Sequence, residues 1–319
     1  MSFKGIKGQD RAIDLLKRSI VNGRVSHAYI FLGPSGVGKF TTALAFAQAF
    51  NCAGAKSGEG CGECAPCRKI LKSNHPDVLV LKPEKDSTSI KIEQMRELIR
   101  NIALRPYEGK KKVYIIDGAE AMTPETSNAL LKTLEEPPSD SVIILVAENL
   151  DNLFATVVSR SQVVRFFPLS TDAVREILVK ECGVDEEKAH VLSRLSSGRL
   201  GEALRYSDAK LFDKRTRIID SLIGKDFFDS DFDGVSRDEM RLYLGIMLTW
   251  FRDILVYKEL GTGAALVNID RKDAIRGEAA NMGSDYLCDA IRRIIETLSY
   301  LDQNANQKLA MAALGMKLS

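Results

Sequence analysis

Short apolar runs alternate with helical patterns of apolar residues through the first half of the chain. Runs of four or five mostly apolar residues are typical of strands buried on both faces of a parallel sheet. They lie at residues 28–32, 78–81, 113–116, 142–146 and 163–167. Apolar residues at helical spacing predict helices over 12–20, 41–50, 92–102 and 128–136. Strands that alternate with helices predict an α/β domain in which helices cover both faces of a parallel sheet.

The pattern changes after Pro168. Only short helical patterns, interrupted by glycines, occur over 171–207, and longer ones follow. The longer ones lie at about 210–223, 236–260, 284–302 and 304–318, with an acidic loop at 226–234 and a turn at 261–263. The sequence therefore predicts three domains: an α/β domain over 1–167, a small helical domain over 168–208 and a helical domain over 209–319.

The composition is that of an ordinary globular protein. The chain has 319 residues, of which 45% are hydrophobic and 28% charged, so it can form two or three domains with cores of their own. A formal net charge of +2 gives no argument for nucleic-acid binding through the net field alone. The sequence starts without an apolar signal region, and its longest clearly apolar run, 142–147, is far too short to span a bilayer. We therefore expect a cytoplasmic protein.

Residues 33–41, which follow the first predicted strand, resemble a phosphate-binding loop. The pattern G-x-x-x-x-G-K-[ST] is matched by Gly33, Gly38 and Lys39. Backbone N–H groups of such a loop bind phosphate oxygens at the start of the next helix, and the lysine pairs with β/γ oxygens. Phe40, however, stands where a hydroxyl would hold Mg²⁺. We expect ATP or ADP as ligand and leave Mg²⁺ binding open. The candidate residues are Gly33, Pro34, Ser35, Gly36, Val37, Gly38, Lys39 and Thr41.

A second motif supports the first. Asp117 ends the predicted strand 113–116, the place of the carboxylate that holds Mg²⁺ in P-loop enzymes. In AAA+ ATPases a glutamate that polarises the attacking water usually follows, but here Gly118 does, and Glu120 lies two residues further on. Phe40 and Gly118 thus remove two separate catalytic groups. The sequence predicts that ATP hydrolysis by this chain is slow or absent.

Four of the six cysteines form a cluster in the sequence. Cys52, Cys61, Cys64 and Cys67 are separated by eight, two and two residues. In a reducing compartment this spacing favours a metal over disulfides, and four thiolates complete a tetrahedral structural Zn²⁺ site with no position open for water. An iron–sulfur cluster is the alternative, because Cys-x-x-Cys-x-x-Cys also suits one. His75 is a further nitrogen, which we interpret as an ordinary loop residue because four cysteines suffice.

With these motifs placed, the chain resembles the subunits of bacterial sliding-clamp loaders along its whole length. The segment 128–138, Asn-Ala-Leu-Leu-Lys-Thr-Leu-Glu-Glu-Pro-Pro, matches that family almost letter for letter. Residues 26–29 (Ser-His-Ala-Tyr), the cysteine spacing and residues 159–161 (Ser-Arg-Ser) also fit it. The resemblance implies an AAA+ α/β domain with a zinc module at 52–67, then a helical lid at 168–208 and a C-terminal helical collar at 209–319.

Within that family the chain is most similar to delta-prime subunits of DNA polymerase III. The motor subunits gamma and tau resemble it closely through residue 167, but they usually carry Thr or Ser after the loop lysine and Asp-Glu in the second motif. An ATP-hydrolysing gamma/tau-type motor subunit is the alternative. The resemblance implies that gamma/tau and delta are partners in a heteropentamer, and that the sliding clamp and primed DNA are reached through the assembled complex.

The resemblance also implies roles for single residues. Arg160 would be an arginine finger that enters the ATP site of a neighbouring subunit, although the residue after it is Ser161 where the family has Cys. Asn149 falls at the sensor-1 position and would orient a γ-phosphate or water. The sensor-2 arginine is replaced by Gly201, which is a third departure from a working ATPase.

Two further features have alternative interpretations. Residues 110–112, three lysines, could contact DNA phosphates, but such a run before a strand is more often a solvated loop. An apolar stripe around Trp250 is predicted to be either collar core or a subunit interface. Its members are Leu244, Met247, Leu248, Phe251 and Leu255.

Overall fold

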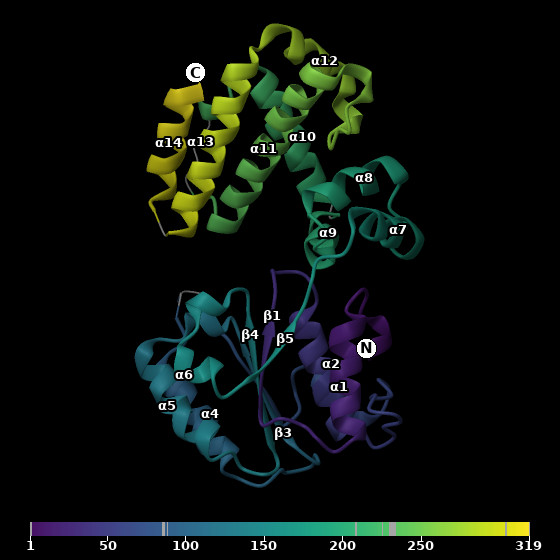
Figure 1. The fold of residues 1–319 in the computed structure, drawn as a ribbon, viewed down its shortest axis with the longest axis vertical. Coiled ribbons are helices and arrows are strands. Elements are labelled where there is room, and N and C mark those ends of the chain that lie inside the picture. The colour runs from purple at the N-terminus through teal and green to yellow at the C-terminus, as the bar shows by residue number, and fades with distance from the viewer. Residues whose placement is uncertain are drawn as a thin grey trace. The chain divides into compact units, whose positions relative to one another are not determined.

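The computed structural model of the chain describes residues 2–84, 87, 89–207, 209–224, 226–229, 234–303 and 305–318. The chain divides into two compact units, Met1–Leu169 and Ser170–Ser319. The first unit is a sheet with helices on both faces, and the second is helical (Figure 1). Among the described residues, no helix is both long and apolar enough to cross a membrane.

The first unit is built on a five-stranded parallel sheet with the strand order β2-β3-β4-β1-β5. The strands are β1 (Ala28–Leu32), β2 (Val78–Leu81), β3 (Lys112–Asp117), β4 (Ser141–Ala147) and β5 (Gln162–Arg165). Leu32 at the end of β1 pairs with Ala147 of β4, and Asp117 at the end of β3 pairs with Val146. The carboxyl ends of β1, β3 and β4 therefore meet at one edge of the sheet.

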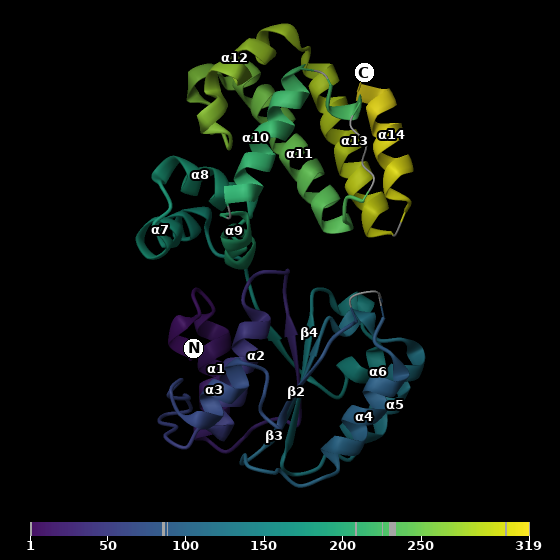
Figure 2. The same cartoon turned by 180° about the vertical axis from the view of Figure 1, so that it is seen from behind.

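Helices cover the two faces of this sheet (Figures 1 and 2). One face carries α1 (Asp10–Val21), α2 (Lys39–Asn51) and α3 (Ala65–Leu71), and the other carries α4 (Ile92–Ile102), α5 (Pro124–Glu135) and α6 (Ala155–Val158). Because successive side chains of a strand point to opposite faces, β1 contributes to two cores. Tyr29 and Phe31 pack in one core with Phe46 of α2, whereas Ile30 packs in the other with Leu130 of α5.

The predicted strands and helices of this unit are confirmed, with some ends shifted. β5 ends two residues earlier than predicted, because the Phe167 N–H group donates to the side-chain oxygen of Gln9 and not to a neighbouring strand. α5 begins four residues earlier, at Pro124, where the Thr123 hydroxyl caps the helix. The short helices α3 and α6 were not predicted.

The second unit is helical in the part of the chain that the structure describes. Its helices are α7 (Thr171–Cys182), α8 (Glu186–Leu195), α9 (Leu200–Tyr206), α10 (Ala209–Gly224), α11 (Arg237–Leu260), α12 (Lys272–Asn281), α13 (Ser284–Asp302) and α14 (Gln307–Leu318). The long predicted helices are confirmed, and α12 is an addition. The predicted turn at 261–263 is a 3-10 helix, as is Phe227–Asp229 within the predicted acidic loop, of which residues 230–233 lie outside the described residues.

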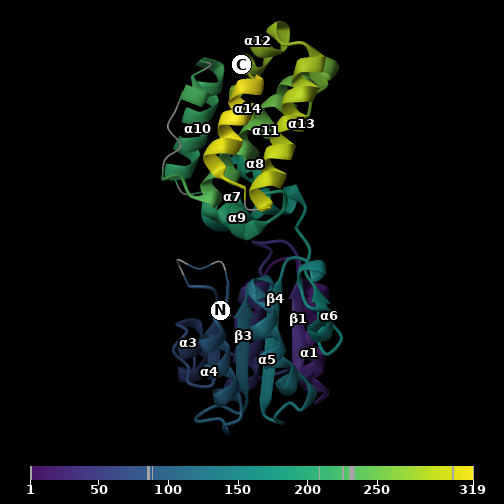
Figure 3. The same ribbon diagram turned by 90° about the vertical axis from the view of Figure 1, so that its left-hand side faces the viewer.

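The core of the second unit lies around α11. Trp250 is 1% exposed, and Leu244, Met247 and Phe251 of the apolar stripe are buried beside it, with Leu248 and Leu255 partly buried against them. The stripe is therefore core. Figure 3 shows α13 and α14 side by side in this unit. The fold class, an α/β P-loop domain with a parallel sheet followed by helical structure, is confirmed, whereas the boundary between a lid and a collar near 208 stays a prediction.

Candidate functional site

The candidate phosphate loop leaves β1 in a backbone conformation that requires glycine at its first position. Gly33 has φ 153°, and a Cβ atom built there would lie 2.3 Å from the carbonyl oxygen of Phe166. Gly38, with φ 98°, is the residue before the first turn of α2. Pro34 and Ser35 are exposed, whereas Val37 is buried. The loop is thus a compact turn that leads directly into the start of a helix.

Lys39 folds back onto its own loop. Its ammonium group donates to the carbonyl oxygens of Gly33 and Pro34, the latter at 2.7 Å, and the residue is 6% exposed. Burial lowers the pKa of Lys39, although the nearby carboxylates of Glu148 and Glu120 act to raise it. The Lys39 ammonium group is therefore already hydrogen-bonded to its own loop. The acidic side chains near it would repel a phosphate group.

The end of β3 carries two acidic residues, Asp117 and Glu120, with Gly118 between them. Burial raises the pKa of Asp117, and Lys39 opposes that shift. Gly118 has φ 76° and ψ 54°, a left-handed conformation that would cost another L-residue about 1–2 kcal/mol. The Glu120 carboxylate accepts from the N–H groups of Glu148 and Asn149, the latter at 3.2 Å. Glu120 therefore holds the start of the loop after β4 through one oxygen of its carboxylate.

The remaining predicted nucleotide residues also lie at this edge of the sheet. Phe40 is partly buried and packs against the core under α1 and α2, and Thr41 is partly buried in the first turn of α2. Asn149 is exposed, and its side-chain oxygen caps the 3-10 helix Leu150–Asn152 by accepting from the Asp151 N–H group at 3.0 Å. The fold thus brings the phosphate loop, Asp117 and Asn149 together, as the order of motifs predicts.

One residue of this region was missed by sequence reasoning. Gln9, 4% exposed, donates to the carbonyl oxygen of Val37 at 3.2 Å and to that of Phe167 at 2.7 Å, and it accepts from the Phe167 N–H group. It joins the phosphate loop to the end of β5. A single polar residue before a helix gives no signal for such a contact, because its partners lie far away in the sequence.

The four cysteines of the predicted metal site lie together. Their sulfur atoms are all within 4.8 Å of one another, with Cys52 3.4 Å from Cys61 and 3.7 Å from Cys64. Four sulfurs about 2.3 Å from one ion in a tetrahedron would be about 3.8 Å apart, so the arrangement fits a closed four-thiolate site. Backbone N–H groups of Glu63 and Cys64 lower the pKa of Cys61 to about 6, whereas burial raises that of Cys67.

Side-chain contacts fix the cysteine module to the two neighbouring helices. Glu59 pairs with Lys17 of α1 at 3.2 Å and accepts from the Lys4 N–H group. Gln48 of α2 donates to the carbonyl oxygen of Cys67 at 2.8 Å. Cys52 directly follows α2, so this helix begins at the phosphate loop and ends at the cysteine cluster.

Arg160 lies just after α6, on the surface. Its Nη1 donates to the carbonyl oxygen of Thr156 at 3.1 Å and to the hydroxyl of Ser159 at 3.2 Å, and its Nη2 is 2.8 Å from a carboxylate oxygen of Glu135. The side chain is 36% exposed. The Ser161 hydroxyl, which stands where the family has a cysteine, donates to the carbonyl oxygen of Val157 and so stabilises the turn.

Comparison with known proteins shows the family to which the chain belongs. A family model described as "DNA polymerase III, delta subunit" matches residues 8–170, and one described as "DNA polymerase III, delta subunit, C terminal" matches 236–315. DNA polymerase III subunit delta' of Bacillus subtilis (strain 168) is 30% identical over 97% of this chain and 96% of that protein. The chain belongs to the delta' family of DNA polymerase III subunits. The delta' subunit of Pseudomonas aeruginosa is 37% identical over 42% of this chain and 41% of its own length.

The delta' family is related to longer subunits. DNA polymerase III subunit tau of Escherichia coli (strain K12) is 33% identical over 65% of this chain, which spans 32% of that protein. Among solved structures, a gamma-subunit-related protein from Thermotoga maritima is 18% identical, covers 96% of this chain and 98% of its own, and has a TM-score of 0.41. The predicted clamp-loader resemblance is confirmed at the level of the family.

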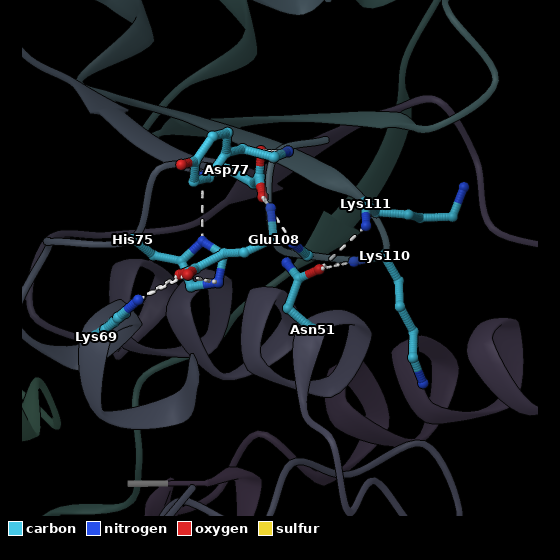
Figure 4. Close-up of polar contacts among 9 residues, drawn as sticks. Asn51, Lys69, His75, Asp77, Glu108, Lys110 and Lys111 are labelled. Atoms are coloured by element: carbon cyan, nitrogen blue, oxygen red, sulfur yellow. Dashed lines mark hydrogen bonds and ion pairs between the residues drawn. The ribbon is translucent and has the colours of Figure 1, made fainter. Parts of the chain in front are cut away.

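The three lysines 110–112 do not form a free basic strip in this delta'-family chain. Lys112 is buried and its ammonium donates to the Asn101 carbonyl at 2.7 Å, and that of Lys111 donates to the Ser139 carbonyl at 3.0 Å. Their backbone is held as well, because Asn51 accepts from the N–H groups of Lys110 and Lys111 (Figure 4). Nothing in this geometry supports a DNA contact through the run as a whole.

His75 belongs to the same anchored region and not to the cysteine cluster (Figure 4). Its Nδ1 accepts from the Asp77 N–H group at 3.1 Å, and the Asp77 carboxylate accepts from three successive N–H groups, those of residues 107–109. Glu108 pairs with Lys69 of α3 at 2.7 Å. His75 was interpreted as an ordinary loop residue; it does lie in a loop, where it is buried and bonded to Asp77.

Proposed function

We propose that this chain is a stator-like subunit of the DNA polymerase III clamp loader, which helps to load the sliding clamp on primed DNA and hydrolyses little or no ATP itself. One observation carries the proposal: the groups that hydrolysis needs are absent from the positions where the fold would use them. Phe40 packs against the core where a Mg²⁺ ligand would stand. Gly118 occupies the glutamate position in a left-handed conformation, and Glu120 is bonded to the loop after β4.

We propose further that Arg160 acts in trans, in the ATP site of a neighbouring gamma/tau subunit. Support comes from its position at the surface, with a guanidinium that is only partly engaged by its own chain. A guanidinium delivered to the transferring phosphoryl group stabilises charge there and is worth about 10³–10⁵ in rate in related enzymes. Delta would be the other partner in the ring.

The chain would also bind two ligands of its own. The phosphate loop would hold ATP or ADP weakly, because Lys39 must first leave the carbonyl oxygens of Gly33 and Pro34. Cys52, Cys61, Cys64 and Cys67 would hold one structural Zn²⁺, which supplies a cross-link between the end of α2 and α3. Metal analysis should give about one zinc per chain; a brown protein that contains iron would favour the iron–sulfur alternative.

The first test measures ATP turnover by the purified chain alone, with Mg²⁺ and primed DNA. We expect negligible turnover. Robust turnover would overturn the stator assignment and favour the gamma/tau-type motor.

The second test replaces Arg160 by alanine in a complex reconstituted with gamma/tau and delta. We expect turnover at the site that Arg160 serves to fall by about 10³-fold or more, while assembly, followed by gel filtration, stays unchanged. Arg24→Ala, at another exposed arginine of the first unit, is the control. Equal activity of the two variants would remove the arginine-finger role.

A further inference from the structure

The Arg160 guanidinium is held from two directions by its own chain. From one side, Nη1 donates to the carbonyl oxygen of Thr156 and to the hydroxyl of Ser159, both in the turn that carries Arg160. From the other side, Glu135 of α5 places a carboxylate oxygen 2.8 Å from Nη2. These contacts come from segments 25 residues apart in the sequence, so the pairing is a product of the fold.

These contacts leave part of the guanidinium available. Arginine has five N–H groups, and Nη1 uses its two on Thr156 and Ser159. Within the described residues, Nε has no hydrogen-bond partner and Nη2 faces only the carboxylate of Glu135. With side-chain exposures of 36% for Arg160 and 49% for Glu135, the pair remains open to solvent. An anion that approaches from outside can therefore meet a guanidinium whose direction is already set.

Glu135 is well placed to set that direction. It is the last residue of α5, which is fixed in the core by Leu130 and Leu134, 0% and 2% exposed. A carboxylate at the C-terminal end of a helix is unfavourable next to the negative end of the helix dipole, so an arginine partner offsets a local cost. The neighbouring Glu136 is exposed and does not share this contact.

We propose that Glu135 is a positioning residue for Arg160. Its carboxylate orients the Arg160 guanidinium so that it can contact the phosphoryl group in the ATP site of the neighbouring subunit. The inference rests on the proposed role of Arg160 in trans. A free arginine side chain samples many rotamers, and fixing it in advance removes that entropic cost from the transition state. The carboxylate thus acts through the arginine and does not touch the nucleotide.

The test uses the reconstituted complex with Glu135→Gln, which keeps the size of the side chain and removes its charge. We expect kcat for ATP to fall about two- to fivefold, which lies within the contribution measured for exposed ion pairs, with KM for ATP and assembly unchanged. Glu135→Asp should recover part of the loss, and Glu136→Gln should have no effect. In the Arg160→Ala background, Glu135→Gln should cause no further loss. A full additional loss there, or no effect of Glu135→Gln on kcat, would overturn the inference.

A second measurement on the isolated chain does not depend on the role in trans. Nitrogen-15 relaxation of the Arg160 Nε–H group should show an ordered side chain in the wild type and in Glu136→Gln, and a mobile one in Glu135→Gln. Equal mobility in all three would refute the positioning role. If Arg160→Ala leaves turnover unchanged while the relaxation result holds, the arginine-finger role fails and the positioning contact stands.

Discussion

Helix α2 has a candidate binding site at each end, and the two sites rest on different parts of the chain. The phosphate loop before Lys39 is made of backbone, with glycines in conformations that other residues adopt at a cost. The cysteine module after Asn51 is made of four side chains that converge on one point. A site formed by backbone groups can keep its shape when nearby side chains change. A site formed by four side-chain ligands can no longer hold its ion when one ligand is removed.

The two sites also differ in the contacts that hold them in place. The phosphate loop follows β1 directly and, without nucleotide, is bonded to Gln9 and to its own lysine. Residues 52–64 contain no helix or strand beyond an isolated bridge between Lys56 and Glu59. We therefore predict that the module needs a bound metal to keep its shape and that the phosphate loop keeps its shape without nucleotide.

Loss of a cysteine ligand should have the largest effect. Cys67 is fully buried, and Cys67→Ser should reduce bound metal from about one ion per chain to near zero. The free energy of unfolding of the first unit should fall by at least about 3 kcal/mol, since structural zinc contributes about 10–16 kcal/mol of binding free energy in zinc-finger peptides. Metal analysis measures the bound ion, and urea denaturation measures the free energy of unfolding. Cys182→Ser, at an exposed thiol outside the cluster, is the control and should match the wild type.

The stability of the phosphate loop should depend on its backbone conformation more than on its side chains. Gly33→Ala places a methyl group against the Phe166 carbonyl oxygen in a positive-φ conformation, and we expect a loss of about 2 kcal/mol or more without nucleotide present. Gly54→Ala is the matched control, because nothing lies within 4 Å of its Cβ position and its φ is not positive. Equal stability of the two variants would mean that the loop backbone is not under this constraint.

The sequence predicted the sites better than their internal contacts. Cysteine spacing is enough to predict the cluster, because all four residues fall within one short segment. The meeting of the phosphate loop with Asp117 could also be predicted, since motifs at the carboxyl ends of parallel strands share one edge. The contacts of Gln9, Glu120 and Glu135 could not, because their partners are 28 or more residues away for the first two and 25 for the third.

The same distinction holds for the fold. Apolar runs predicted each of the five described strands, because the three central strands are buried on both faces and leave a continuous signal, and the partly exposed edge strands β2 and β5 still carry short apolar runs. The helices α3 and α6, with seven and four residues, are too short for a helical period to show. The early start of α5 had a local signal, Thr123 followed by Pro124, which a search for apolar spacing alone overlooks.

Restoring the missing hydroxyl should have a smaller effect than either change above. Phe40→Thr should make ATP binding depend on Mg²⁺ and raise its affinity by at most about tenfold, the effect of about 1.4 kcal/mol. Turnover should stay negligible, because Gly118 supplies no carboxylate. Phe40→Ala creates a similar void without the hydroxyl and should show no Mg²⁺ dependence. Binding of a fluorescent ATP analogue with and without Mg²⁺ distinguishes them, and substantial hydrolysis by Phe40→Thr would contradict the assignment of Gly118 as a second block.

The smallest effect concerns the proton on Lys39. Burial lowers the pKa of Lys39 below its ordinary value of 10.5, so the unfolded chain binds this proton more tightly than the folded chain. Between the two pKa values unfolding takes up a proton, and the contribution of Lys39 to stability therefore rises with pH toward 10.5. In urea denaturation, the difference between wild type and Lys39→Met should grow in favour of the wild type as the pH rises toward 10.5. Lys110→Met, at an exposed lysine outside the phosphate loop, is the control. A flat difference for Lys39→Met would mean that the lysine is solvated in solution and that the loop is open to phosphate.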